Sequence, residues 1–333
     1  MKIDTGIGAN LSSVSARARE AEQAGLDCLW AAETTHDPFL SLVLAAEHSQ
    51  RVSIGTSIAI AFARNPMSLA YTTNQLQDFS RGRLVLGLGS QVRAHIQRRF
   101  SAEWSRPAAR MREFILALRA VWGSWNEGAT LDFQGEFYTH TLMTPLFSPR
   151  PHAFGAPRVF LAAVGERMTE VAGEVADGII THGLSSARYV REVTLPALER
   201  GLLQSGRTRR DIEVTCPGFI AVVENEEQED KARTAMRRQL AFYGSTPAYR
   251  PVLDLHGWGD LQPELYDCSK RGAWEEMSVL VNDEMLNTFS IVTYPESLAG
   301  EVRVRYGGLA DRINAAWWRK SWWPAVGEEL RSL

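Results

Sequence analysis

Short apolar runs alternate with amphipathic stretches along this chain, and the pattern repeats eight times. The runs are "KIDTGIG", "CLWAA", "RVSIGTSIAI", "RLVLGLGS", "RVFLAAVG", "DGIITHG", "DIEVTCPGFIAVV" and "NTFSIVTYP". Each run precedes a stretch with helical spacing of apolar residues, such as Met111, Ile115, Leu118 and Trp122. Nearly continuous apolar strands separated by amphipathic helices indicate a parallel sheet with right-handed crossovers.

Eight such units in 333 residues favour a closed barrel over an open sheet, because no linker rich in Pro, Gly and Ser divides the chain. We therefore predict one α/β domain over residues 1–333, a (β/α)8 TIM barrel with two insertions. The first, at about 126–156, alternates around Gln134 and Gly135 and predicts a hairpin. The second, at about 243–272, is rich in Pro, Gly and aromatic residues and predicts a long loop packed as a lid.

Charge and cysteine content exclude several classes of protein. The 36 Lys and Arg are scattered and outnumbered by 39 Asp and Glu, so we expect no nucleic-acid partner. No apolar run approaches the roughly 18 residues of a membrane span, and no secretory leader pattern opens the chain, so we expect a cytoplasmic protein without a membrane partner. Cys28, Cys216 and Cys268 are far apart, without CxxC spacing, so we expect reduced thiols and no metal site.

In a TIM barrel the chemistry lies at the carboxyl ends of the strands. The residues that follow the apolar runs here are mostly small or neutral: Glu33 and His36, Phe62 and Arg64, Ser90 and Gln91, 163–165, and 181–183. They lack the His and Asp set of a metal hydrolase, the Lys of a Schiff-base aldolase and the paired carboxylates of a glycosidase. The mouth is therefore predicted to hold a large flat molecule that brings its own reactivity, with one histidine reaching in.

Two glycine-containing stretches are candidates for a nucleotide site. "GLGSQV", residues 87–92, lacks the spacing and the acidic residue of a dinucleotide fingerprint. "LAAVGERM" delivers Ala163, Val164 and Gly165 to a helix start, where free N–H groups favour a phosphate. A plain tight turn between strand and helix explains this second stretch equally well.

Taken together, the segments "GLDCLWAAETTHDPF", "GTSIAIAFARNP", "FSRGRLVLGLGS", "VFLAAVGERMTEVAGEVADGII" and "RYGGLADR" resemble the luciferase-like flavin and deazaflavin oxidoreductases. The similarity is greater to the actinobacterial branch that uses coenzyme F420. This resemblance implies a bacterial luciferase-like barrel with a non-proline cis peptide at Ser57–Ile58 supporting the deazaflavin ring. It also implies that His36 faces the reactive ring carbon. The remaining implied cofactor contacts are Ser90 and Gln91 beside the ring or its ribityl chain, and Ala163, Val164, Gly165, Thr181 and His182 around the tail phosphate.

The chain departs from the sugar-phosphate dehydrogenases that it resembles. Those enzymes carry a carboxylate two residues after the position of Ser90, where this chain has Val92, and their lysine cluster for a sugar phosphate is not evident. A proton must then come from His36, Glu33 or a group of the substrate. We predict that His36 is the acid or base, since an imidazole exchanges protons near neutral pH. A histidine that only hydrogen-bonds the cofactor or caps "DPF" is the alternative.

The predicted function is hydride transfer between coenzyme F420 and a small organic substrate, which the lid aromatics indicate is apolar or ring-bearing. One alternative is an FMN-dependent two-component monooxygenase of the same fold, and another is a non-catalytic flavin-binding protein. Cations beyond the phosphate turn, such as Arg167 or Arg188, would favour F420 with its longer anionic tail. Family members are often dimers, so we expect a homodimer. The tail residues Trp317, Trp318, Trp322 and Trp323 either dock on their own barrel or form a dimer contact.

Overall fold

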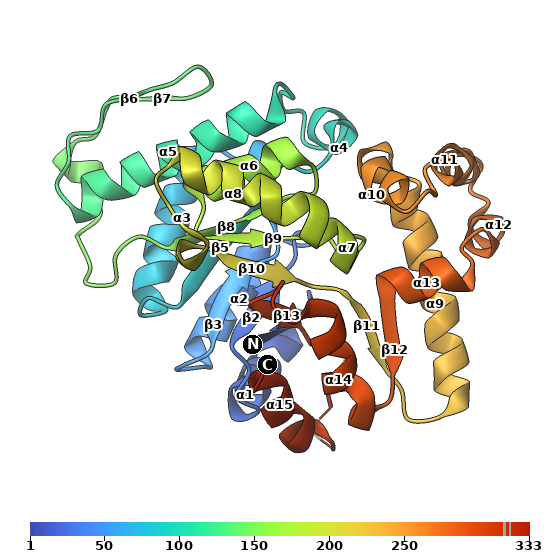
Figure 1. Ribbon diagram of the computed structural model, residues 1–333. Helices are drawn as coiled ribbons and strands as arrows, with labels where there is room; N and C mark the ends of the chain where they lie inside the picture. The colour runs from blue at the N-terminus through green and yellow to red at the C-terminus, as the bar shows by residue number, and fades with distance from the viewer. Residues whose placement is uncertain (316–317, 320) are drawn as a thin grey trace.

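Eight parallel strands form a closed barrel in the computed structural model, which describes residues 1–315, 318–319 and 321–333 (Figure 1). Strand β1 pairs with β13, and β3 pairs with β5, so the sheet has no open edge. The short β4 (Ala59–Ile60) follows β3 and pairs with β5 further along. The predicted TIM barrel is confirmed. Its strands are β1 (Lys2–Gly6), β2 (Cys28–Ala31), β3 (Ser53–Thr56), β5 (Leu84–Gly89), β8 (Arg158–Ala162), β9 (Gly178–Ile180), β10 (Glu213–Cys216) and β13 (Arg312–Asn314).

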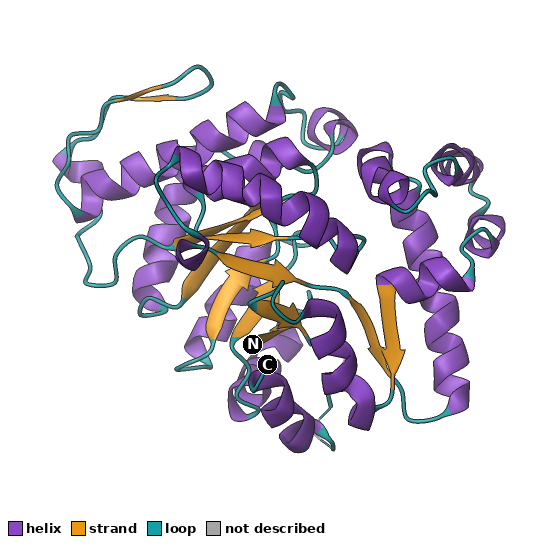
Figure 2. Ribbon diagram, viewed as in Figure 1, coloured by secondary structure: helices purple, strands orange, loops and turns teal. Residues whose placement is uncertain are grey.

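Helices cover the outside of the barrel (Figure 2). Sequence signals set their limits: the Asn65 side chain accepts the Met67 N–H, and Pro66 begins α3 with its fixed φ. The apolar stripe of α5 is buried along its whole length, and α5 packs between α3 and α6. The covering helices are α1 (Leu11–Gln23), α2 (Pro38–Glu47), α3 (Pro66–Phe79), α5 (Pro107–Asn126), α6 (Glu166–Val175), α8 (Leu195–Gln204), α14 (Pro295–Tyr306) and α15 (Trp323–Arg331).

The seventh predicted strand is too long, and the eighth predicted strand is wrong. Pro217 and Gly218, the latter with φ +58°, divide the run expected as one strand into β10 and β11 (Phe219–Val222). The run expected as the eighth barrel strand contains β12 (Ser290–Thr293), which pairs with β11 in a separate two-stranded sheet beside the barrel (Figure 1). The eighth barrel strand is β13. Only three residues long, it is too short to give a clear apolar run.

The insertion between α5 and β8 contains an antiparallel hairpin, β6 (Phe133–Gln134) with β7 (Thr139–His140). The Glu113 carboxylate of α5 ties it down by accepting the N–H groups of residues 136–138.

The second insertion is helical, so the expectation of a long loop over 243–272 is wrong. It lies within α9 (Glu226–Gly244), α10 (Arg250–Leu255), α11 (Leu261–Arg271), α12 (Trp274–Val279) and α13 (Asp283–Phe289), which stand beside the barrel (Figure 1). Pro251 and Pro263 fall in first turns, where proline is tolerated, while Gly257 and Gly259 lie between helices. These helices bury an apolar cluster of their own that includes Leu240, Leu253, Leu265, Met277 and Leu286.

Two layers of side chains fill the interior of the barrel: an apolar layer and, nearer the amino ends of the strands, a charged layer. Trp30 and Phe160 lie with ring centroids 6.0 Å apart, packed with Cys28, Val85 and Ile180. Toward the amino ends of the strands, Arg312 donates to both carboxylate oxygens of Asp4, at 2.6 and 2.8 Å, and Trp30 Nε1 donates to Asp4 at 2.9 Å. The Asp4 side chain is fully buried. Nothing in the sequence pattern predicted this pair.

The two ends of the chain meet on one side of the barrel (Figure 1), where the Met1 amine donates to the Arg331 carbonyl at 3.2 Å. Trp323 is buried, and its Nε1 donates to the Ala24 carbonyl at 2.8 Å, so this tail tryptophan docks on its own barrel. Trp318 and Trp322 pack against the same core, whereas Trp317 lies outside the described residues. Among the described helices none is long and apolar enough to cross a membrane.

Candidate functional site

A cavity of about 730 Å³ opens at the carboxyl ends of the barrel strands. It is lined by the segments that follow β3, β5, β8, β9 and β10, together with α9 and the turn before α10. Nine of the residues expected at a cofactor site from sequence meet there: Ser57, Ile58, Ser90, Gln91, Ala163, Val164, Gly165, Thr181 and His182.

The floor of this cavity is the segment between β3 and β4, where the Ser57–Ile58 peptide bond is cis, as the family resemblance implied. Close approach of β5 supports the floor. A Cβ on Gly87 would lie 1.8 Å from the Thr56 carbonyl oxygen, and a Cβ on Gly89 would lie 2.8 Å from the Ile58 side chain. Glycine at these two positions therefore lets β5 pack directly against the segment that bears Ile58.

The segment after β5 forms one edge of the cavity. Gln91 adopts φ +60°, and its side-chain Oε1 accepts the Val92 N–H at 3.0 Å. Ser90 Oγ donates to the Gln91 carbonyl at 3.1 Å. Arg93, at the start of α4 (Arg93–Arg98), is the one charged side chain among the described residues that line the cavity. No carboxylate that could deliver a proton lies at this edge among the residues that the structure describes.

The turn between β8 and α6 has the geometry of an anion cradle. Gly165 is the N-cap residue of α6, and no side chain caps the helix start. A Cβ on Gly165 would meet no atom within 4 Å, so the backbone faces open space. The first N–H groups of a helix have no partner within the helix and attract negative charge. Glu166 in this first turn is paired with Arg200 at 2.6 Å, which compensates its charge.

Another part of the cavity is lined by an aromatic wall made by His182, Phe219, Tyr243 and Tyr249. The His182 ring stacks on Tyr249, with centroids 4.5 Å apart and planes at 23°, and meets Tyr243 edge-on at 4.4 Å. Its Nδ1 accepts the Leu184 N–H at 3.1 Å. Burial lowers the pKa of His182 to about 4 and raises the pKa of Tyr249 to about 12, so both rings are uncharged at neutral pH.

The structure does not bring the two expected proton carriers into this cavity. His36 lies exposed on the segment between β2 and α2, with Nδ1 2.6 Å from Thr35 Oγ1. Glu33 is nearly buried, and its Oε2 accepts the Ile60 N–H at 2.7 Å and Arg64 Nη1 at 2.6 Å. The Glu33 carboxylate is therefore hydrogen-bonded to β4 and Arg64, and Glu33 does not line the cavity.

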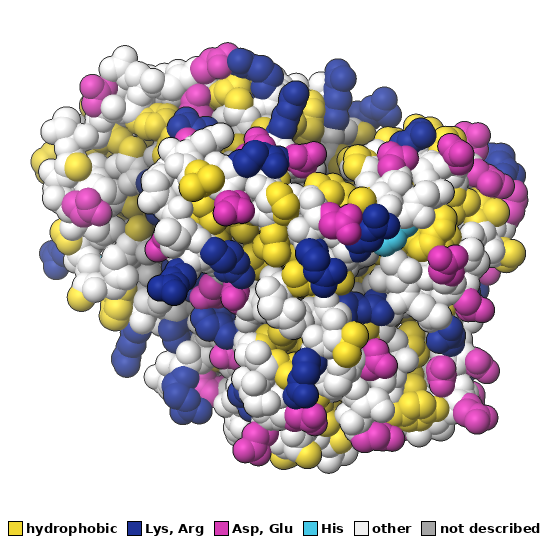
Figure 3. Space-filling model, in the orientation of Figure 1, with side chains coloured by type: hydrophobic (Ala, Val, Ile, Leu, Met, Phe, Trp, Pro, Cys, Tyr) yellow, Lys and Arg dark blue, Asp and Glu magenta, His cyan; other side chains and the backbone are white. Residues whose placement is uncertain are grey.

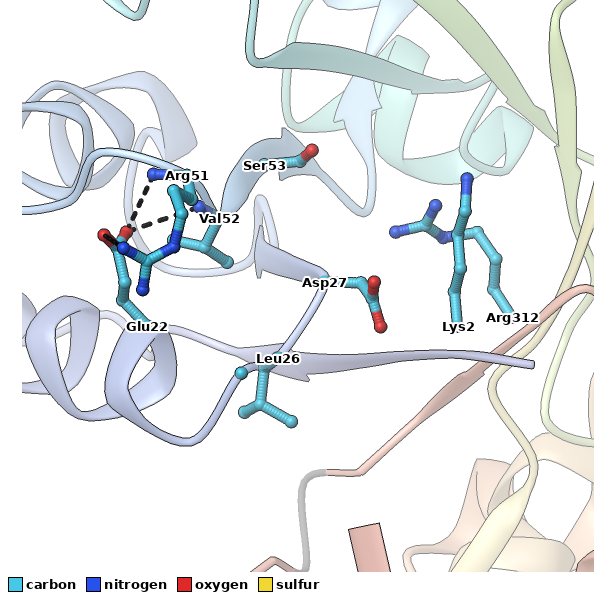
Figure 4. A pocket seen from close by; sticks show the side chains of 9 residues that line it. Lys2, Glu22, Leu26, Asp27, Arg51, Val52, Ser53 and Arg312 are labelled. Carbon is cyan, nitrogen blue, oxygen red and sulfur yellow. Dashed lines mark hydrogen bonds and ion pairs between the residues drawn. The ribbon is translucent and has the colours of Figure 1, made fainter. Parts of the chain in front are cut away.

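A second, smaller hollow of about 350 Å³ lies at the amino ends of the strands and is lined by Glu22, Asp27, Lys2 and Arg312 among others (Figure 4). Glu22 accepts the N–H groups of residues 50–52, and Asp27 accepts the Ile3 N–H. Lys2 and Arg312 both pair with Glu213. The carboxylates of this hollow are therefore already engaged within the chain.

Sequence reasoning missed two members of the aromatic wall. Phe219 was placed inside a continuous strand, although the preceding Pro-Gly pair signals a break that would have put it at a strand end. Tyr243 lies on α9, outside the strand ends of the barrel, and only the tertiary fold brings it to the mouth. Of the two cations expected to favour F420, Arg188 is bound to Glu192 and to the Leu255 carbonyl, and Arg167 is exposed on α6.

Comparison with known proteins agrees with this geometry. The model of the luciferase-like monooxygenase family matches residues 2–312. An uncharacterized protein of Mycobacterium tuberculosis is 53% identical over 313 residues, covering 94% of this chain and 92% of that protein. An F420-dependent glucose-6-phosphate dehydrogenase of Intrasporangium calvum is 32% identical over 58% of this chain and 60% of its own length. The solved coenzyme F420-dependent tetrahydromethanopterin reductase of Methanopyrus kandleri shares the fold, with a TM-score of 0.78, 20% identity, and coverage of 94% of this chain and 92% of that one.

Proposed function

Because the chain belongs to the luciferase-like monooxygenase family, we propose that it is an oxidoreductase that transfers a hydride between coenzyme F420 and a small, apolar or ring-bearing organic substrate. The observation that carries the proposal is the cavity itself. It joins a floor at Ser57–Ile58 to an uncapped helix start at Gly165, and it is large enough for a flat cofactor with an anionic tail.

In this proposal the deazaflavin ring lies on Ser57 and Ile58 with Ser90 and Gln91 at its edge. The tail phosphate takes the turn of Ala163, Val164 and Gly165, with Thr181 and His182 nearby. Open space at the Gly165 Cβ position fits a phosphate against the backbone. When bound, F420 supplies a two-electron hydride centre, while the chain orients the partners and keeps water out.

Reduction of a carbonyl or imine also needs a proton. His36 is our candidate donor, because the mobility of an exposed side chain after β2 would let it reach the mouth once cofactor and substrate are bound. Glu33 is a weaker candidate for the proton donor, because its carboxylate already accepts hydrogen bonds from Arg64 and the Ile60 N–H. We assign Glu33 the role of a positioning residue for β4.

An FMN-dependent monooxygenase is the second candidate, since the chain belongs to the luciferase-like monooxygenase family. Arg93 in the cavity lining and Arg167 on the first turn of α6 support F420 instead, since its tail is longer and more anionic than that of FMN. A third candidate, a carrier of flavin without catalysis, would have no use for the aromatic wall. We also propose that the protein works as a homodimer, which analytical ultracentrifugation would test.

Fluorescence titration of the purified full chain with F420, and separately with FMN, tests the proposal. F420 binding at least tenfold tighter than FMN binding supports hydride transfer with deazaflavin. Tighter FMN binding would favour the monooxygenase. Binding of neither cofactor would overturn the assignment of the cavity.

A further inference from the structure

Three members of the aromatic wall, Phe219, Tyr243 and Tyr249, are outside the set of residues assigned to the cofactor, and His182 connects that set to the wall. The polar atoms of His182 indicate what the wall can recognise. Leu184 donates its N–H to His182 Nδ1, so a neutral ring carries its proton on Nε2. Nε2 has no hydrogen-bond partner among the described residues. Nε2 is not one of the fully buried polar atoms, so it keeps some accessible surface. His182 lines the cavity, and a ligand there can therefore reach this atom.

The walls beside His182 are rings. Tyr249 covers one face of the imidazole, and Tyr243 meets its edge. Phe219 and Tyr243 are themselves nearly parallel, with planes at 20° and centroids 5.8 Å apart. A flat molecule in this space gains contact with aromatic surface on its broad side. The described residues that line the cavity include no Asp, Glu or Lys, and its one charged side chain, Arg93, is not part of the aromatic wall. The wall itself therefore offers no charged partner to a substrate.

We infer that this wall is a substrate clamp for flat, uncharged ring compounds that carry a hydrogen-bond acceptor, and that His182 Nε2–H donates to that acceptor. The inference deepens the proposed function and moves His182 from the phosphate turn to the substrate side. The low pKa of His182 agrees with it, because the ring stays a neutral donor across the physiological range. Anionic sugar phosphates are disfavoured, since a neutral imidazole among aromatic rings does not compensate a phosphate.

Isothermal titration of the full chain with three probes tests the clamp. Chromone is flat and uncharged with a ring carbonyl, naphthalene has no acceptor, and chromone-2-carboxylate adds a negative charge. We expect His182→Phe to weaken chromone binding about five- to tenfold, the equivalent of one hydrogen bond, and to leave naphthalene binding unchanged. His182→Gln keeps a donor near the Nε2 position and should bind chromone within about twofold of the original chain, which also guards against a folding defect in the Phe variant. Chromone-2-carboxylate should bind more weakly than chromone.

A second pair of variants separates stacking from hydrogen bonding. Tyr249→Phe keeps the ring and should retain chromone binding, whereas Tyr249→Leu should weaken both chromone and naphthalene about threefold or more. Tyr266→Leu, on α11 outside the cavity lining, is the matched control and should change neither affinity.

The inference is overturned if the original chain does not bind chromone, if His182→Phe binds it equally well, or if the carboxylate binds more tightly than chromone. It is also overturned if His182→Phe weakens F420 as much as chromone, because His182 would then hold the cofactor. Failure of F420 and FMN to bind, with the chromone series behaving as expected, would refute the proposed function and leave the clamp standing.

Discussion

Arg64 donates from Nη1 to Glu33 Oε2 at 2.6 Å, and the same carboxylate oxygen accepts the Ile60 N–H at 2.7 Å. Glu33 thus links the segment after β2 to β4, just beyond the cavity floor. The exposed fraction of its side chain is only 9%, so water replaces these bonds poorly. This arrangement is typical of a positioning residue.

Substitution Glu33→Ala should lower the free energy of unfolding by about 1–3 kcal/mol, because it leaves the Ile60 N–H and Arg64 without their shared acceptor. Glu33→Gln should recover part of that loss, since the amide oxygen still accepts the Ile60 N–H. Urea denaturation measures both. A role for Glu33 as the proton donor would instead require turnover to vanish in Glu33→Gln with stability and cofactor affinity unchanged.

His36→Ala should fold like the original chain, to within about 0.5 kcal/mol, because the side chain is exposed. If His36 transfers the proton, turnover of a substrate found by screening should fall about 10²- to 10⁴-fold while F420 affinity stays the same. The exposed His95 on α4 provides a matched variant, His95→Ala, expected to keep full turnover. Equal turnover in both variants would remove His36 from the mechanism.

Gly165→Trp should abolish or weaken F420 binding at least tenfold, because the indole would fill the space in front of the α6 helix start. No atom lies within 4 Å of the Cβ position, and φ is −77°, so the thermal midpoint should barely change. Gly300→Trp is the matched control, since Gly300 on α14 is also exposed with open space at Cβ. Unchanged F420 affinity in Gly165→Trp would show that the tail phosphate binds at another place.

Arg312→Met should destabilise the protein by about 3–5 kcal/mol, because it strands the fully buried Asp4 carboxylate without its counter-charge. Arg112→Met removes an exposed ion pair with Glu174 and should cost less than about 1 kcal/mol. Guanidinium denaturation of the two variants gives the comparison. A loss as small as that of Arg112→Met would mean that Asp4 is neutral in the folded protein.

Most of the barrel could be predicted from local pattern, because fully buried parallel strands are nearly continuous apolar runs. The exceptions were strands whose pattern is short or interrupted. β13 has three residues, one of them Arg312, whose charge is compensated by Glu213 and by Asp4 from the other end of the chain. Pairing across such a distance in sequence cannot be read from periodicity.

The candidate site, like the barrel, could be predicted from the sequence only in part. Residues at strand ends, such as Ser90 and Gly165, could be found because the barrel fixes where strand ends meet. Tyr243 could not, because its position depends on how a separate group of helices packs against the barrel. Glu33 follows a strand and was expected to face the cavity, yet Arg64 and the Ile60 N–H turn its carboxylate away.

Acid should destabilise this protein partly through Glu213. Burial alone would raise the pKa of Glu213, but hydrogen bonds from Lys2 and Arg312 and the charge of Arg158 outweigh it and lower the pKa to about 2. An unfolded chain holds Glu213 at its ordinary value near 4.5, so the unfolded state binds a proton first as the pH falls. The stabilisation from this carboxylate is therefore complete above about pH 4.5 and is lost as the pH falls through about 2.

Glu213→Gln should remove about 1–2 kcal/mol of stability at pH 7, a value reduced from the full pKa shift because solvent reaches part of the side chain. The difference in unfolding free energy between the original chain and this variant should shrink steadily from pH 5 to pH 2. Urea denaturation at a series of pH values measures that difference. A difference that stayed constant over this range would show that Glu213 is not held ionised by Lys2, Arg158 and Arg312, and that its contribution to the amino end of the barrel is packing instead of charge.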